Sequence, residues 1–144
     1  MNRDKENDLS DEELKNTENA TLSVHYCSIC GKMVFILKDD FKKLPKRKSD
    51  RSTVIDESTV LAKNYLKREK QVIIKRKYGY EKQWRRICQE CESPLGYQTR
   101  PYEDKGKSGY YLYIYPKGVV SSVGDCRVAK EIAKLAAEKK VKQA

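Results

Sequence analysis

The sequence predicts an α+β fold in which small antiparallel hairpins are held together at two cysteine-containing turns and followed by a C-terminal helix. Four cysteines form two CxxC pairs, Cys27 with Cys30 and Cys88 with Cys91, and each pair lies beside a hairpin pattern. Hydrophobic residues make up only 38% of the chain and charged residues 36%, so the core is small and needs a staple. From Arg127 onward the pattern changes to helical spacing. We therefore expect zinc-ribbon-like knuckles in a β-rich domain.

Charge and periodicity divide the 144 residues into three regions. Residues 1–20 contain seven acidic and three basic side chains, a net charge of −4, and have little to bury, so we expect a disordered acidic tail. Residues 21–126 are predicted to form the zinc-stapled β-rich domain, and residues 127–144 a basic amphipathic helix. Because the whole chain has a net charge of +10, the residues after the tail have +14. Such a basic body attracts RNA, an acidic protein or an anionic membrane surface.

The first half of the domain is predicted to begin with a hairpin. Ser23–Cys27 and the apolar run Met33–Leu37 both have the length of strands, and the first cysteine pair lies in the turn between them. A polar, basic loop is expected over Lys42–Arg51. The stretch Ser58–Lys67 is predicted to be a short helix that turns three apolar side chains inward, those of Leu61, Tyr65 and Leu66.

The second half is predicted to contain further antiparallel strands. Val72–Ile74 is a short strand, and Gln83–Cys88 with Leu95–Thr99 forms the hairpin around the second cysteine pair. Tyr110–Tyr115 is the clearest strand because it is rich in aromatic residues. We expect Val119–Val123 to return as its partner.

The C-terminal helix is predicted from apolar residues at helical spacing. Asp125 precedes the pattern and is expected to cap the helix at its start. Lysines lie off the apolar stripe, which consists of Val128, Ile132, Leu135 and Ala136.

The two CxxC pairs predict one structural Zn²⁺ per chain, with Cys27, Cys30, Cys88 and Cys91 as ligands. Two cysteines separated by two residues present both sulfurs to one ion, and zinc takes four such ligands in a tetrahedron. The 57 residues between the pairs exceed the spacing of a compact zinc module, so the inserted region must fold beside the metal. The alternatives are buried unligated cysteines, a redox CxxC and a catalytic zinc. Neither pair opens a helix in a βαβ unit, and four cysteines leave no open coordination position.

Two further residues were weighed as chemical groups. Cys126 stands alone before the final helix and is interpreted as a small buried hydrophobe. His25, the single histidine, shares the face of Cys27 on the first strand and is expected beside the ligands or at the surface. No acid–base or nucleophile constellation is visible in the sequence, so we expect no enzymatic activity.

Basic residues gather in two clusters. Six lie within the loop Lys42–Arg51, and six more lead into the second cysteine pair, with Tyr78, Tyr80 and Trp84 among them. Exposed aromatics beside cations stack on unpaired bases, whereas buried ones belong to the core. We expect the aromatics beside this cluster in the core, above all Trp84, because it is the single tryptophan of a chain with few apolar residues.

The chain resembles the STING ER exit protein family in three stretches that follow one another in the family's order over residues 25–98, with weaker similarity to Val120. The first contains the initial cysteine pair, as His25-Tyr26-Cys27 and Cys30-Gly31-Lys32-Met33-Val34. The second contains Leu44-Pro45, Arg47, Asp50-Arg51-Ser52 and Val54-Ile55-Asp56. The third contains Glu81, Gln83-Trp84-Arg85-Arg86, Cys88, Cys91, Pro94-Leu95 and Tyr97-Gln98.

The resemblance implies a non-catalytic adaptor that helps a membrane receptor leave the endoplasmic reticulum through contacts with the receptor or the vesicle coat. It also implies a link to spliceosomal particles. Members are expected in the cytoplasm and nucleus, and the absence of a signal peptide or apolar span predicts a chain that is not secreted and has no transmembrane segment. The chain is shorter than the larger relatives, which continue into long charged helices. The resemblance suggests Asp50, Arg51 and Ser52 as a partner-facing loop. We expect the partner-binding set to include basic residues of the two clusters as well, namely Lys46, Arg47, Arg85 and Arg86.

Two functions therefore remain open at this stage. One is the protein-binding adaptor in membrane traffic, and the alternative is a nuclear, spliceosome-associated factor that contacts RNA or ribonucleoprotein through its basic surface. They differ in their salt response, because binding through many lysines weakens steeply as salt rises, whereas an apolar protein contact does not.

Overall fold

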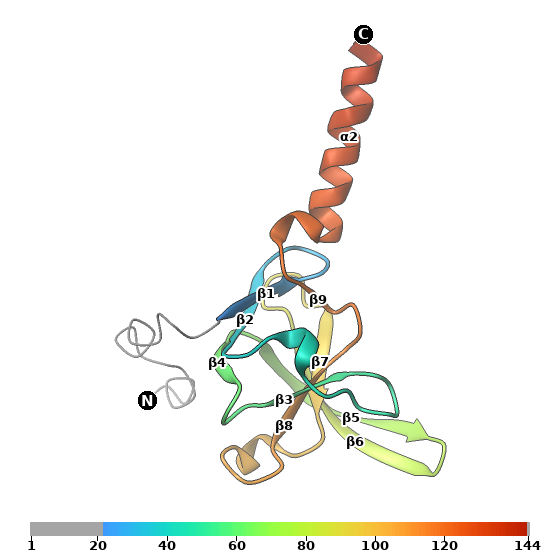
Figure 1. Cartoon of the computed structure of the whole chain (residues 1–144). Coiled ribbons are helices and arrows are strands. Elements are labelled where there is room, and N and C mark those ends of the chain that lie inside the picture. The colour runs from blue at the N-terminus through green and yellow to red at the C-terminus, as the bar shows by residue number, and fades with distance from the viewer. Residues whose placement is uncertain (1–21, 144) are drawn as a thin grey trace.

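The computed structural model describes residues 22–143, and the predicted acidic tail at residues 1–20 lies outside them. The described chain is mostly β-strand, with one α-helix at its end (Figure 1). The strands are β1 (Ser23–Cys27), β2 (Met33–Leu37), β3 (Thr53–Asp56), β4 (Leu61–Asn64), β5 (Lys67–Arg76), β6 (Gly79–Ile87), β7 (Pro94–Gln98), β8 (Tyr111–Ile114) and β9 (Val119–Val120). The helix is α2 (Arg127–Gln143), and the short 3-10 helices are η2 (Phe41–Lys43), η3 (Tyr102–Asp104) and η4 (Val123–Asp125).

The strands form two antiparallel sheets. One has the order β4-β2-β1-β9 and the other the order β3-β8-β7-β6-β5. The predicted α+β class, with antiparallel hairpins and a C-terminal helix, is confirmed. The hairpins at both cysteine pairs are also confirmed, as β1 with β2 and β6 with β7.

The hydrophobic core contains residues from both sheets. Alternation along several strands buries one face, as in β8, where Leu112 and Ile114 are fully buried and Tyr111 is exposed. Among the glycines, Gly96 in β7 has the closest neighbour, because an added Cβ would lie 2.3 Å from the Tyr113 carbonyl oxygen. The core cluster comprises Cys27, Val34, Phe35, Leu37, Leu44, Ile55, Leu61, Leu66, Cys88, Leu95, Leu112 and Ile114.

Two sequence-based expectations about strands are wrong. The predicted helix over Ser58–Lys67 is instead a turn followed by β4, which pairs with β2, because an open edge of that sheet takes up the extended chain. The predicted partner of Tyr110–Tyr115 is also wrong. Both edges of β8 are occupied, by β3 and β7, so β9 pairs with β1 in the other sheet.

Helix α2 stands away from the β-rich body (Figure 1). Its first turn is tied to the turn after β1, since the backbone N–H of Arg127 donates to the Ser28 carbonyl (2.7 Å) and that of Val128 to the Ile29 carbonyl (2.9 Å). The expected cap at Asp125 is replaced by Cys126, whose Sγ accepts the backbone N–H of Ala129 (3.4 Å). The apolar stripe is exposed, with Ile132 at 61% and Leu135 at 62%. Among residues 22–143, no helix combines the length and apolar character that crossing a bilayer requires.

Candidate metal centre

The two CxxC turns have the same backbone geometry. In each, the N–H of the first cysteine donates to the carbonyl five residues later, from Cys27 to Lys32 (2.8 Å) and from Cys88 to Ser93 (3.0 Å). The residue four positions after the first cysteine donates back to that cysteine's carbonyl, at 3.0 Å in both turns. That residue has a positive φ, 82° at Gly31 and 60° at Glu92. A positive φ favours glycine, so Gly31 suits this position of the first knuckle, whereas Glu92 is strained at the same position of the second.

The four sulfurs of the two knuckles meet at one point. The Sγ atoms of Cys27 and Cys91 are 3.6 Å apart, those of Cys30 and Cys88 are 3.5 Å apart, and all four lie within 4.8 Å of one another. A tetrahedral ion with metal–sulfur bonds of about 2.3 Å places its sulfurs about 3.8 Å apart. These distances exceed a disulfide bond, and all the cysteines are free. The prediction that the four cysteines come together is confirmed, and their donor set fits a structural zinc ion.

Burial and mutual contacts shift the pKa values of three of the four cysteines. Burial raises the pKa of Cys27 to about 12, and burial together with the thiols of Cys88 and Cys91 raises the pKa of Cys30. Burial also acts to raise the pKa of Cys91, but hydrogen bonds from Ser93 and the neighbouring thiols lower it to about 7. A divalent cation bound between the sulfurs would favour their thiolate form, because its positive charge offsets the cost of burying negative charge.

The centre joins the two sheets of the fold. Cys27 and Cys30 belong to the turn between β1 and β2, whereas Cys88 and Cys91 belong to the turn between β6 and β7. Cys27 and Cys88 are buried in the core cluster, and Cys91 is exposed. A metal ion here would cross-link strands of both sheets at the edge of the core.

His25 and Cys126 lie near the centre but are not among its ligands. The His25 ring is buried between Phe35 and Phe41, with ring centroids 5.2 and 4.8 Å away, and its Nε2 lies 3.2 Å from the Ser23 hydroxyl. The expected burial of Cys126 is confirmed, and a Cβ added at Gly31 would lie 3.1 Å from its sulfur. Cys126 thus packs behind the first knuckle.

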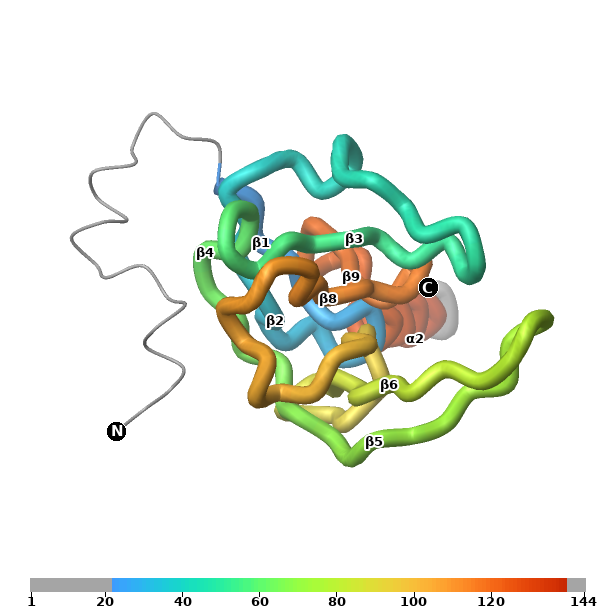
Figure 2. Tube along the Cα trace, turned by 90° about the horizontal axis from the view of Figure 1, so that it is seen from below, coloured from blue at the N-terminus to red at the C-terminus, as the bar shows by residue number. Residues whose placement is uncertain are grey.

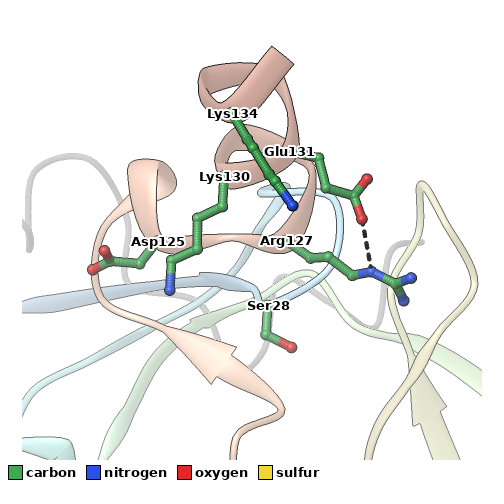
Figure 3. A pocket seen from close by; sticks show the side chains of 6 residues that line it. All are labelled: Ser28, Asp125, Arg127, Lys130, Glu131 and Lys134. Carbon is green, nitrogen blue, oxygen red and sulfur yellow. Dashed lines mark hydrogen bonds and ion pairs between the residues drawn. The ribbon is translucent and has the colours of Figure 1, made fainter. Parts of the chain in front are cut away.

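A shallow cavity of about 370 Å³ lies between the first knuckle and the start of α2 (Figure 3). Lys130 and Lys134 reach back along the helix toward Ser28, and Arg127 forms an ion pair with Glu131 (3.2 Å). Acidic and basic side chains are mixed in its lining, so the cavity has no strong preference for the charge of a ligand.

The second family-like stretch contributes to an internal polar network rather than to an open loop. Arg47 forms a bidentate ion pair with Glu81 across the sheet edge, and its Nη1 donates to the Tyr97 hydroxyl (2.7 Å). The Tyr97 hydroxyl in turn donates to Asp50 (2.5 Å), and Arg76 completes the network with ion pairs of 3.4 Å to Asp50 and 3.3 Å to Glu81.

The charges in this network are mutually stabilised. Hydrogen bonding from Arg47 lowers the pKa of Glu81 to about 2. Burial acts to raise the pKa of Asp50, but hydrogen bonds from Ser52 and Tyr97 and the charge of Arg76 outweigh it, and the pKa is lowered. Both carboxylates are therefore ionised at neutral pH.

Not all of the residues suggested for partner binding lie at the surface. Ser52 is fully buried, and Arg86 is buried beside Glu57 (3.6 Å) with hydrogen bonds to Gln98 and the Leu66 carbonyl. These two side chains contact the interior of the fold, and the partner-binding set as a whole stays a prediction. Arg47, Asp50 and Arg85 are partly buried, and Lys46 and Arg51 are exposed.

The motif Asp50-Arg51-Ser52 forms a tight turn that presents Arg51. Asp50 Oδ1 accepts both the backbone N–H (2.9 Å) and the hydroxyl (2.6 Å) of Ser52. Arg51 between them has a φ of 61° and an exposed side chain. The flanking residues thus fix the backbone, and the arginine faces solvent.

Sequence reasoning missed one surface feature. The tyrosines beside the second basic cluster were weighed as core residues, yet Tyr78 is 92% and Tyr80 76% exposed. The available signal was the Lys-Tyr-Gly-Tyr sequence, in which a glycine-containing turn places both tyrosines at a hairpin end.

Two hairpin knuckles that bring four cysteine sulfurs together, followed by a projecting helix, define a small β-rich domain with a candidate metal site. Residues 16–129 match the family model of the STEEP1 domain, and the chain belongs to that family. The chain is also 39% identical over 100 residues to the STING ER exit protein of Drosophila melanogaster. That alignment covers 65% of this chain but only 39% of the fly protein, so the chain spans well under half of its relative's length.

Proposed function

We propose that this chain is a non-enzymatic, zinc-stapled adaptor that promotes the exit of a membrane receptor from the endoplasmic reticulum through protein–protein contacts on the cytoplasmic side. The observation that carries the proposal is the match of residues 16–129 to the STEEP1 domain, supported by the similarity to a fly protein named for STING exit from that compartment. Zinc has a structural role in this proposal. Four cysteine ligands fill a tetrahedral shell and leave no position for a reacting water.

Arg51 is the side chain that we propose contacts the protein partner. Its turn is held by Asp50 and Ser52, so the guanidinium is presented from a fixed backbone at a small ordering cost. Lys117 offers a matched control, because it is also an exposed basic residue with a φ of 61°. Asparagine tolerates this backbone conformation, so Arg51→Asn and Lys117→Asn each remove one charge without adding strain.

The test is receptor transport in native cells depleted of the protein. We expect depletion to slow the arrival of the receptor at the Golgi, and wild type and Lys117→Asn to restore the rate, whereas Arg51→Asn does not. Purification of each variant with its partners should recover the receptor or vesicle-coat proteins with wild type and with Lys117→Asn, and much less of them with Arg51→Asn. An unchanged transport rate after depletion would refute the adaptor function.

A second candidate is a nuclear, spliceosome-associated role with RNA contact. One observation favours it, namely the exposure of Tyr78 and Tyr80 among lysines at the end of the β5–β6 hairpin. Recovery of ribonucleoprotein particles instead of membrane proteins in the same purification would support this candidate.

A further inference from the structure

The hairpin of β5 and β6 projects from the body of the domain as a two-stranded arm. Figures 1 and 2 show its end extending beyond the other strands, on a different side from α2. The two strands stay paired to the last residues before the turn, where Arg76 lies opposite Gly79. The arm is thus an ordered part of the larger sheet.

Aromatic, apolar and basic side chains alternate on one face of this arm. Directly opposed residues in an antiparallel pair lie on the same face, and the register places Tyr80 opposite Lys75 and Ile73 opposite Lys82. Tyr80 is 76% and Ile73 64% exposed, and both lysines are exposed. On this face the arm therefore presents the aromatic ring of Tyr80 beside the exposed ammonium groups of Lys75 and Lys82.

Tyr78 lies in the turn and is the most exposed large hydrophobic side chain of the described residues, at 92%. The Lys77 ammonium lies 5.4 Å from the centre of its ring. Within residues 22–143, neither the Tyr78 nor the Tyr80 hydroxyl has a hydrogen-bond partner. Both side chains are largely exposed, so a ligand in solution can reach them.

A groove of about 620 Å³ runs between the end of the arm and the segment Arg47–Ser49. Its wall is held in place by the ion pairs of Arg47 and Arg76 with Glu81, which leave Lys48 and Lys77 as the lining cations without an ion-pair partner among the described residues. The full lining consists of Arg47, Lys48, Ser49, Arg76, Lys77, Tyr78, Gly79, Tyr80 and Glu81.

We infer that the end of the β5–β6 arm and this groove form a binding site for single-stranded nucleic acid. Unpaired bases stack on exposed aromatic rings, and the phosphates between them pair with lysines, so both halves of the ligand are matched here. An acidic peptide would use the lysines and leave the rings without a role. A lipid surface would contact the extended tip of the arm and leave the groove without a role. The inference is independent of the adaptor function and gives the second candidate a defined site.

The test measures binding of the zinc-loaded full chain to a labelled oligouridine of about ten nucleotides, with oligothymidine of the same length as the DNA arm. The key variant is Tyr78→Ala/Tyr80→Ala, and Tyr78→Phe/Tyr80→Phe is its conservative counterpart. We expect the alanine variant to lose at least about tenfold in affinity and the phenylalanine variant to stay within about twofold, because a phenyl ring still stacks. Both tyrosines are exposed, so neither change removes a core contact, and far-UV circular dichroism with zinc content verifies the fold.

A charge variant separates this site from bulk attraction. Lys75→Gln/Lys77→Gln/Lys82→Gln should weaken binding and flatten the dependence of log affinity on log salt by about two units, at about 0.7 per phosphate contact. The control Lys130→Gln/Lys134→Gln/Lys139→Gln removes the same charge from exposed positions on α2 and should leave affinity within about threefold. A preference for oligouridine over oligothymidine would identify RNA as the ligand, and equal affinity would leave the site general for single strands.

Three results would overturn the inference. The first is no binding of either oligonucleotide at low salt. The second is equal loss from the arm and α2 charge variants with no loss from Tyr78→Ala/Tyr80→Ala, which would indicate bulk charge alone. The third is tyrosine-dependent binding only to phosphatidylserine vesicles or only to a polyglutamate peptide.

Discussion

Removing the metal should unfold the β-rich domain. The site links Cys30 to Cys88, which are separated by 57 residues. Losing this cross-link gives the unfolded chain back the conformational freedom of a long loop, which favours unfolding. By the loop-entropy relation such a closure is worth about 4 kcal/mol, which is a large part of the 5–15 kcal/mol that stabilises a typical domain. The core cannot compensate, because both Cys27 and Cys88 are part of it and lose their partners together.

The assay combines metal analysis with denaturant unfolding. We expect one zinc per chain in wild type, and little or none in Cys88→Ser/Cys91→Ser, with the urea transition lost or shifted to near zero denaturant. Cys126→Ala is the matched control, since its sulfur is buried but lies outside the four-cysteine cluster, and it should keep the full metal content. The reasoning is refuted if purified wild type contains no zinc, or if the double variant retains it, or if chelation changes the unfolding free energy by less than about 1 kcal/mol.

Further predictions concern the backbone and the polar network. Gly96→Ala should destabilise the fold by more than about 3 kcal/mol or prevent folding, because its Cβ would overlap a carbonyl oxygen on β8; soluble expression and thermal melting check this. Glu92→Gly should raise the unfolding free energy by a few tenths to about 1 kcal/mol by relieving a positive φ, whereas Gly31→Ala should lower it; urea unfolding of both compares the two knuckles, and a loss in Glu92→Gly would contradict the argument. Arg47→Met and Glu81→Gln should show a coupling of about 2 kcal/mol in a double-mutant cycle at neutral pH, and additive effects would refute it. Because the pKa of Glu81 is lowered to about 2, its contribution is complete above about pH 4.5 and disappears as the pH falls toward 2, which carboxyl NMR titration measures.

Local sequence signals sufficed for the hairpins and the cysteine cluster. The spacing within each CxxC pair and the apolar runs beside them are local features, and Ser23–Cys27 with Met33–Leu37 formed as predicted. The long insertion between the pairs also had to fold beside the metal, and it does so by contributing strands to both sheets.

The errors arose where pairing between distant strands decides the structure. Leu61 and Leu66 are buried as expected, but the open edge of β2 draws residues 61–64 into a strand, and no local pattern reveals that edge. Val119–Val120 lies next to the tyrosine strand in sequence, yet β8 already has neighbours on both sides.

The loop Lys42–Arg51 was predicted to be open to solvent, and its ion pairs were missed for a similar reason. Arg47 and Asp50 read as solvated charges, because their partners Glu81 and Arg76 are more than 25 residues away in sequence. Conversely, Tyr78 and Tyr80 read as core residues in a chain with few apolar side chains, and only the length of the β5–β6 arm places them in solvent.

Because α2 is attached to the first knuckle, any rotation of that knuckle would also change the direction of the helix. Two backbone hydrogen bonds, from Arg127 to Ser28 and from Val128 to Ile29, set the angle at which the helix leaves the body. A helix of 17 residues is about 25 Å long, so a rotation of the knuckle by about 10° swings its far end by about 4 Å. A pair of spectroscopic labels, one on the sheet and one on the helix, would register such a displacement as a change in distance.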